Sequence, residues 1–218
     1  LIGVDLMADV VRSLRSILPQ GDPFHEVGAE NVLINSQIEK GFTGNKGKGG
    51  FYAEIDGEQM ALDLGTGEWR PRSKQLPEIS IKGEKQGVTA LLSGSDKLSK
   101  FAWKVLARIL TYSASLIPEV TTTPQDIDDA MKLGYNWVKG PFELIDEIGS
   151  EVIVSRLEAE KFHVPEFLQH ARGSKFYKVV GGALKVRHWG GEFHPIKLPK
   201  GVVRFHLTRQ TLKPIMEN

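Results

Sequence analysis

An internal repeat constrains the fold of this chain more than any other feature of its sequence. The segment FYAEIDGEQMALDLGTGEWRP, residues 51–71, parallels FYKVVGGALKVRHWGGEFHP, residues 176–195. Both begin with Phe-Tyr, place Ala-Leu after a glycine turn, and end on Gly-Glu, an aromatic residue, one variable residue and Pro. LIGVDLM at 1–7 similarly parallels EIGSEVI at 147–153. Because repeated units bury a face against one another, the sequence predicts two similar units, each of helices followed by a β-hairpin.

Size and composition exclude several classes of protein. The chain has 218 residues, of which 40% are hydrophobic and 25% charged, as in ordinary globular proteins. The net charge of +1 gives no reason to expect nucleic acid or an anionic membrane as a partner. No apolar run approaches the roughly 18–20 residues that a membrane span needs. The absence of cysteine excludes a disulfide scaffold and a thiol nucleophile, and it fits a cytoplasmic location.

Hydrophobic periodicity and turn residues predict the secondary structure. Thr123 can cap a helix that begins with Pro124, and Asp56-Gly57 is typical of a two-residue hairpin turn. A second hairpin is expected to turn at Gly181-Gly182. The predicted helices cover about 3–19, 28–40, 96–118, 124–134, 141–160 and 164–171, and the predicted strands cover 50–55, 59–64, 175–180 and 183–188.

The beginning of the chain reads as the middle of an amphipathic helix without a start signal or a signal peptide. We therefore expect a fragment of a longer protein. The predicted divisions are a first helical unit with a hairpin over 1–75, truncated at its N-terminus, a connecting segment with at most short helices over 76–95, and a second helical unit with a β-containing tail over 96–218.

The stretch GFTGNKGKGGFY, residues 41–52, has the composition of a phosphate-binding loop. A P-loop needs Gly-Lys followed by Ser or Thr and then by a helix, whereas Lys48 precedes two glycines and a predicted strand. A dinucleotide fingerprint also fails, because no strand–helix–strand unit surrounds the stretch. Two interpretations stay open: a flexible connection that ends in a hairpin, and a loop whose Lys46 and Lys48 contact a ligand phosphate. Lys46 and Lys48 are thus the candidate substrate-binding residues.

Side-chain chemistry alone predicts no catalytic residue and no metal ligand. Asp126, Asp128 and Asp129 lie at a predicted helix N-terminus, where a solvated negative charge suits the helix dipole. Residues two positions apart do not share a helix face. The six histidines show no metal-binding spacing such as His-x3-His, and no serine stands in a nucleophile-elbow context.

A family resemblance comes from the segment DIDDAMKLGYNWVKGPFELIDEIG, residues 126–149. It resembles the signature of the C-terminal helical domain of 3-hydroxyacyl-CoA dehydrogenases, and TGNKGKGGFY, residues 43–52, resembles the segment that closes that domain. Two copies in tandem resemble the long multifunctional dehydrogenases of fatty-acid β-oxidation. The stretch 176–205 is similar to the one that, in some of these chains, leads into a fused enoyl-CoA hydratase domain.

The resemblance implies NAD-dependent oxidation of 3-hydroxyacyl-CoA to 3-ketoacyl-CoA, in which a His accepts the hydroxyl proton and a Glu orients that His. The family carries these residues and its NAD fingerprint in an N-terminal Rossmann domain that is absent here, so no cofactor is expected on this chain. The position that matches the family's catalytic Asn falls on Trp103 in the second copy, which implies a structural role there. Asn136, Val138 and Lys139 depart from the family's usual residues before Gly-Pro-Phe.

The sequence therefore predicts a mainly α fold of two tandem helical units of the 3-hydroxyacyl-CoA dehydrogenase C-terminal type, each ending in a small β-hairpin. The expected function is substrate-cleft closure and packing or dimer surface in the intact dehydrogenase, and the fragment alone is expected to be inactive. Expected partners are acyl-CoA, the NAD-binding domain, a fused hydratase domain and a second copy, with no nucleic acid and no membrane. The alternative is a stand-alone helical module that binds acyl-CoA or a protein and has no redox role.

Overall fold

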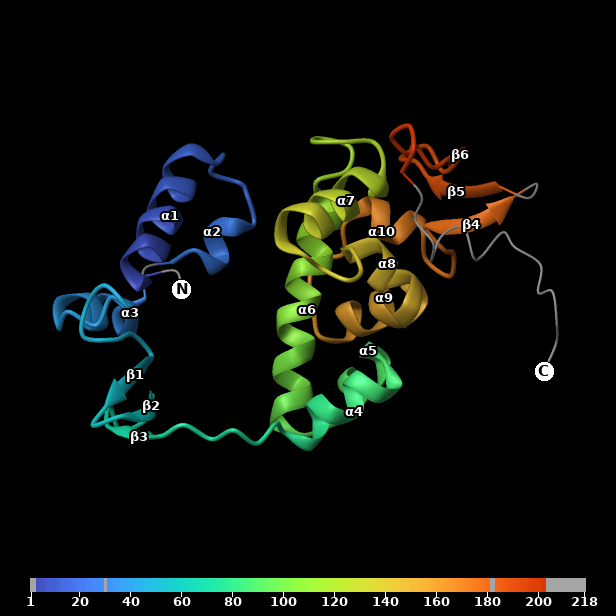
Figure 1. Ribbon diagram of the computed structural model, residues 1–218. Helices are drawn as coiled ribbons and strands as arrows, with labels where there is room; N and C mark the ends of the chain where they lie inside the picture. The colour runs from blue at the N-terminus through green and yellow to red at the C-terminus, as the bar shows by residue number, and fades with distance from the viewer. Residues whose placement is uncertain (1–2, 30, 181–182, 203–218) are drawn as a thin grey trace. The chain divides into compact units, whose positions relative to one another are not determined.

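The computed structural model describes residues 3–29, 31–180 and 183–202 (Figure 1). The chain divides into two compact units, Leu1–Gln75 and Leu76–Asn218, called here the first and the second unit. About half of the structure is helical, with two small three-stranded sheets. This composition confirms the mainly α class expected from the sequence.

The first unit begins with helices α1 (Val4–Ile17), α2 (Phe24–Val27) and α3 (Val32–Glu39). The helix predicted over 28–40 corresponds to α3, which begins four residues later, and α2 was not predicted. Gly28 ends α2, and Asn31 starts α3 because its side-chain oxygen accepts the backbone N–H groups of the next turn. α1 and α3 pack against each other.

The sheet of the first unit contains β1 (Tyr52–Ile55), β2 (Glu58–Leu62) and β3 (Trp69–Pro71), all antiparallel in the order β1-β2-β3. Asp56 and Gly57 both have positive φ angles, 53° and 80°, which a type I′ hairpin turn requires. The predicted hairpin is confirmed. The third strand was not predicted, since its three residues are too few to show a periodic pattern.

The second unit contains seven helices among its described residues. Residues 76–95, expected as a connecting segment with at most short helices, form two of them. These two helices pack against each other, and the second also packs onto the longest helix. The helices are α4 (Glu78–Gln86), α5 (Val88–Leu92), α6 (Lys97–Ser115), α7 (Pro124–Tyr135), α8 (Pro141–Ile148), α9 (Ser150–Ala159) and α10 (Glu166–His170).

Local signals explain where these helices begin and end. The Asp96 side chain caps α6, and Thr123 caps α7 with Pro124 in its first turn, as the sequence predicted. One helix was predicted over 141–160, and two are present. Gly149 separates them because its φ of 99° is compatible with a turn and not with a continuous helix.

The second sheet follows the same plan as the first. It contains β4 (Tyr177–Val180), β5 (Ala183–Arg187) and β6 (Phe193–Pro195), antiparallel in the order β4-β5-β6. The predicted turn at 181–182 lies outside the described residues. Each strand has as many residues as its counterpart in the first unit. The register is also the same: Tyr52, the first residue of β1, pairs with the fourth residue of β2, and Tyr177, the first residue of β4, pairs with the fourth residue of β5.

The core of the second unit lies where α6 meets α5, α8 and α10 (Figure 1). Phe142, Phe167 and Phe176 are its aromatic centre, with ring centroids 4.9 to 6.0 Å apart. Burying each such side chain contributes about 1.5–3 kcal/mol. This packing holds the α7–α8 segment and the start of β4 in fixed positions.

Candidate functional site

The segment that resembles the dehydrogenase signature is organised around Asp128 of α7. Its carboxylate accepts the N–H groups of Phe142 at 2.8 Å and Glu143 at 3.2 Å, and the hydroxyl of Tyr177 at 2.7 Å. The Asp128 side chain has no exposed surface. Burial raises the pKa of Asp128 to about 7, although the bonds from Tyr177 and Phe142 favour the ionised form. Burial also raises the pKa of Tyr177, and Asp128 raises it further.

This geometry corrects the expectation of solvation for one member of the acidic cluster of α7, since Asp128 is buried whereas Asp126 is exposed. Asp128 does lie at a helix N-terminus, but that helix is α8, whose first N–H groups it caps. Gly140 precedes α8, and a Cβ atom there would lie 2.3 Å from the Asp128 Cγ atom. Only glycine fits this approach, which explains the Gly-Pro-Phe sequence at the start of α8.

A second carboxylate, the half-buried Asp146 at the end of α8, fixes the start of the sheet. It accepts the N–H of Phe176 at 2.7 Å and that of Tyr177 at 2.8 Å. Burial raises the pKa of Asp146 to about 6. Asp128 and Asp146 therefore tie α7, α8 and β4 into one hydrogen-bonded unit through Tyr177.

The loop between α7 and α8 presents polar groups at the surface of this unit. Asn136 ends α7 in the left-handed conformation, and Val138 is 90% exposed. Lys139 forms an ion pair with Glu147, so its ammonium is engaged by the protein itself. Lys132 and Glu143, each with a 12% exposed side chain, form a second ion pair at 2.6 Å that links α7 to α8.

Trp103, at the position that the resemblance equates with a catalytic Asn, is 2% exposed and lies in the core. The guanidinium of Arg156 stacks over its ring at 4.2 Å. A large apolar side chain in this position fills the core and offers no polar contact to a substrate.

The Gly-Lys stretch forms a hydrogen-bonded loop in the first unit. The N–H of Lys48 donates to the Gly41 carbonyl at 3.0 Å, and the loop is joined to α1 by the bond from Val4 N–H to the Thr43 carbonyl at 3.1 Å. The strand β1 follows it, as predicted, so the loop does not lead into a helix as a P-loop does.

The two candidate lysines of this loop differ in their surroundings. The Lys46 ammonium lies 2.5 Å from the Asp5 carboxylate of α1, and this hydrogen bond lowers the pKa of Asp5. Lys48 is exposed, and among the described residues no carboxylate forms an ion pair with it.

A hollow of about 210 Å³ lies between α1 and α3 in the first unit. Its wall combines apolar side chains with Arg12 and Arg15, and neither Lys46 nor Lys48 lines it. Arg15 donates to the Gly28 carbonyl at 2.9 Å. The amphipathic pattern of α1 was visible in the sequence, but α3 as its partner was not. The lining residues are Met7, Ala8, Val11, Arg12, Arg15, Ala29, Asn31, Ile34 and Asn35.

The structure also brings together three side chains that could hold a metal ion, although the sequence analysis expected no metal site. They are His188, Glu192 and His194, at the turn between β5 and β6. β6 was not predicted, so the sequence alone did not place these side chains side by side.

Comparisons with known proteins agree with these features. A family model described as "3-hydroxyacyl-CoA dehydrogenase, C-terminal domain" matches residues 101–181. Two proteins named "Putative fatty acid oxidation complex trifunctional enzyme" are similar: that of Rickettsia felis is 32% identical over 183 residues and that of Rickettsia prowazekii 31% over 185, each match covering 83% of this chain. A "Probable 3-hydroxyacyl-CoA dehydrogenase" of Bacillus subtilis is 28% identical over 224 residues, covering 100% of the chain.

The chain spans about a quarter of the length of these relatives: 25% of the two Rickettsia proteins and 28% of the Bacillus protein. No solved structure matches it. None of the described helices is long and apolar enough to cross a membrane.

By class, the chain is similar to helical domain structure in proteins that are named for fatty-acid oxidation or as a 3-hydroxyacyl-CoA dehydrogenase. More particularly, residues 101–181 belong to the 3-hydroxyacyl-CoA dehydrogenase family and form its C-terminal domain. The resemblance noted in the sequence is thereby confirmed. The matched residues run from α6 to the end of β4, and so include Asp128, Asp146 and the Tyr177 hydroxyl that joins them.

Proposed function

We propose that the chain is part of an NAD-dependent 3-hydroxyacyl-CoA dehydrogenase of fatty-acid β-oxidation, which oxidises 3-hydroxyacyl-CoA to 3-ketoacyl-CoA. The observation that carries the proposal is the family match over the Asp128-centred segment. The residues described here contribute closure of the substrate cleft and packing or dimer surface. The NAD and the catalytic His-Glu pair belong to a Rossmann domain outside these 218 residues, and the fragment is inactive alone.

The two units are, in this proposal, tandem copies of one helical domain. The support is the repeated sequence together with the equal strand lengths and equal register of the two sheets. In both units, a helix also begins directly after an Ile-Gly pair, at Val4 and at Ser150. The copies differ in the loop before the sheet, where only the first unit carries the Gly-Lys stretch.

The Gly-Lys loop is the proposed contact with the phosphates of the CoA moiety. Lys48 is the main candidate because it is exposed, whereas Lys46 must leave the Asp5 carboxylate before it can bind an anion. Asp5 also repels a phosphate at this position. Both lysines are therefore substrate-binding residues in the proposal, and Lys48 contributes the larger part of the affinity.

Calorimetric titration of CoA into the purified chain tests this contact. Lys48→Ala is expected to raise the dissociation constant of CoA several-fold, and Lys46→Ala is expected to raise it less. Lys74→Ala, another exposed lysine of the first unit, is the matched control and should leave the affinity unchanged. Equal affinities of CoA for Lys48→Ala and the wild type would remove the loop from the substrate site.

A second candidate function is a stand-alone acyl-CoA-binding module with no redox role. The hollow between α1 and α3 favours it, since apolar walls with two nearby arginines suit an apolar chain with an anionic group. Reading the open reading frame upstream of Leu1 separates the two functions. A strand–Gly-x-Gly-x-x-Gly–helix unit followed by a His/Glu pair supports the dehydrogenase, whereas an unrelated domain or a stop codon supports the module.

A further inference from the structure

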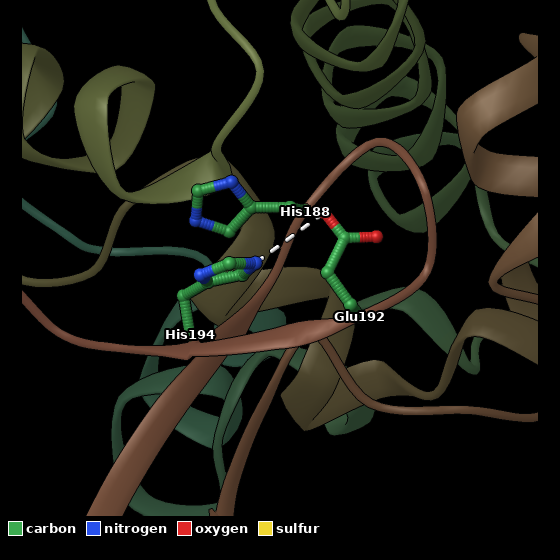
Figure 2. Close-up of side chains that lie close together, drawn as sticks. All are labelled: His188, Glu192 and His194. Carbon is green, nitrogen blue, oxygen red and sulfur yellow. Dashed lines mark ion pairs between the residues drawn. The ribbon is translucent and has the colours of Figure 1, made fainter.

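The turn between β5 and β6 gathers three metal-ligating side chains on one side of the sheet (Figure 2). Figure 2 shows the rings of His188 and His194 one above the other, with the Glu192 carboxylate beside them. The ring centroids are 4.2 Å apart, and the His194 Nε2 atom lies 3.4 Å from a Glu192 carboxylate oxygen. One ligand atom from each residue lies within 4.8 Å of the others.

The backbone of the turn fixes this arrangement. The N–H of His188 donates to the Glu192 carbonyl at 2.9 Å, and the N–H of Gly191 donates to the His188 carbonyl at 2.9 Å. The strand pairing places Val186 opposite His194. The N–H of Trp189 donates to the Thr122 carbonyl at 3.1 Å, which anchors the turn to the segment before α7. Three ligands on such a short, hydrogen-bonded turn need little ordering when an ion binds.

The first unit has a corresponding turn that is one residue longer, 63–68 against 188–192, and that carries other side chains at two of the three positions. Its backbone bond from Asp63 N–H to the Glu68 carbonyl, at 2.8 Å, corresponds to the bond from His188 to Glu192. Asp63 and Arg70 occupy the positions of His188 and His194, and they form an ion pair with 3.4 Å between the Arg70 Nε atom and the carboxylate. In the first unit, therefore, a guanidinium supplies the positive charge of the turn. In the second unit, two imidazoles replace this pair.

The chemistry of the three ligands selects a class of cation. Two imidazole nitrogens and one carboxylate are a common ligand set for Zn²⁺, and imidazole also suits other late divalent transition metals.

The distances require a rearrangement of the side chains. With metal–ligand bonds of about 2.0–2.1 Å in a tetrahedral site, two ligand atoms on one ion lie about 3.4 Å apart. Ligand atoms that lie up to 4.8 Å apart must therefore close by up to roughly 1.4 Å. Glu192 and His194 are exposed and free to rotate about their side-chain bonds, whereas His188 is half-buried.

We propose that His188, Glu192 and His194 bind one divalent transition-metal ion of the zinc class, with the remaining coordination position open to water. The ion takes the place in the second unit that the Arg70 guanidinium has in the first. It links β5 to β6 and, through Trp189, holds the end of the sheet against the segment before α7. The site is structural, and it is independent of the dehydrogenase function proposed above.

The test is titration of the full, tag-free 218-residue chain with Zn²⁺ by calorimetry and with Co²⁺ by visible absorption. The wild type is expected to bind one equivalent, with the absorption bands of a low-coordinate Co²⁺ site. His188→Ala and His194→Ala should each weaken binding at least about tenfold, since loss of an outer-shell partner alone costs 10–100-fold. His163→Ala, which removes an exposed histidine outside the turn, should bind like the wild type.

A double variant guards against misfolding. His188→Asp combined with His194→Arg places the Asp and Arg of the first unit's ion pair at the corresponding positions of the second sheet, so it should fold normally and bind no metal. Three results would overturn the proposal: no saturable binding to the wild type, wild-type affinity in this folded double variant, or an equal loss of affinity in His163→Ala.

Discussion

The carboxylate of Asp128 offers the sharpest test of how the dehydrogenase segment is held together. We consider Asp128→Ala, which removes the acceptor of three hydrogen bonds. Two of the donors, the Phe142 N–H and the Tyr177 hydroxyl, are buried with it. Each buried donor left without a partner costs about 1–3 kcal/mol. The loss of hydrogen bonds therefore predicts a decrease of roughly 2–6 kcal/mol in the free energy of unfolding.

An opposing effect depends on pH. The pKa of Asp128 is raised from the ordinary value of 3.8 to about 7. Between these values the native state holds a proton that the unfolded state has released, so wild-type stability falls as the pH rises through this window. At about 1.4 kcal/mol for each tenfold change in proton affinity, the full loss is about 4 kcal/mol. The substitution to Ala removes this loss together with the carboxyl group.

The two effects separate when unfolding is measured at two pH values. At pH 5 the native carboxyl is protonated, so Asp128→Ala should cost the full roughly 2–6 kcal/mol of the broken hydrogen bonds. At pH 8 the wild type bears the buried charge. The two pH units between pH 5 and the pKa of about 7 cost it about 3 kcal/mol, so the difference between variant and wild type should be smaller by that amount than at pH 5. Asp126→Ala, which removes an exposed carboxylate of the same helix, is the control. It removes a helix-dipole contact and an exposed hydrogen bond from the Thr121 hydroxyl, so its cost should be about 1 kcal/mol and the same at both pH values.

Urea denaturation gives the free energies, and hydrogen exchange at the first amides of α8 shows whether the loss is local to the Asp128 contacts. A larger destabilisation at pH 8 than at pH 5 would refute the reasoning, because it would mean that the three donors lower the pKa of Asp128 instead of burial raising it. A cost below about 1 kcal/mol at pH 5 would show that the donors find other partners.

Two further substitutions probe the same unit. Gly140→Ala places a Cβ atom 2.3 Å from Asp128 Cγ, so α8 must shift. We expect a lower melting temperature than for the control Gly134→Ala, where a Cβ atom meets no other atom within 4 Å. Equal melting temperatures would contradict the close approach. Burial raises the pKa of Asp146 to about 6, so the wild type should lose stability as the pH rises from about 4 to 6. Asp146→Asn should remove that part of the pH dependence in a series of urea-unfolding measurements. An unchanged pH profile would contradict the raised pKa of Asp146.

Local sequence signals predicted much of the fold because they act over a few residues. The Thr123-Pro124 start of α7 and the Asp56-Gly57 turn are decided by backbone geometry within one turn of chain. The sequence also shows Gly149, but this glycine breaks the helix only because its φ angle is positive. A glycine inside an apolar pattern does not by itself reveal whether a helix continues through it.

The site was harder to predict because its contacts join distant parts of the sequence. Asp128 lies in an acidic helix start, where solvation is the usual fate of a carboxylate, and its hydroxyl donor, Tyr177, is 49 residues away. The three side chains of the β5–β6 turn became neighbours only through β6, a strand of three residues. The family segment was found nonetheless, because a close backbone approach and a helix start leave the local mark Gly-Pro-Phe.

The central claim is that these residues serve a 3-hydroxyacyl-CoA dehydrogenase and depend on a separate domain for NAD. The most direct measurement is NADH formation from 3-hydroxyacyl-CoA and NAD, made on the 218-residue chain and on the product of the whole open reading frame that encodes it. The account predicts substrate-dependent NADH formation by the product of the whole reading frame and none by the 218 residues. NADH formation by the 218 residues alone, or no activity in the product of the whole reading frame, would contradict it.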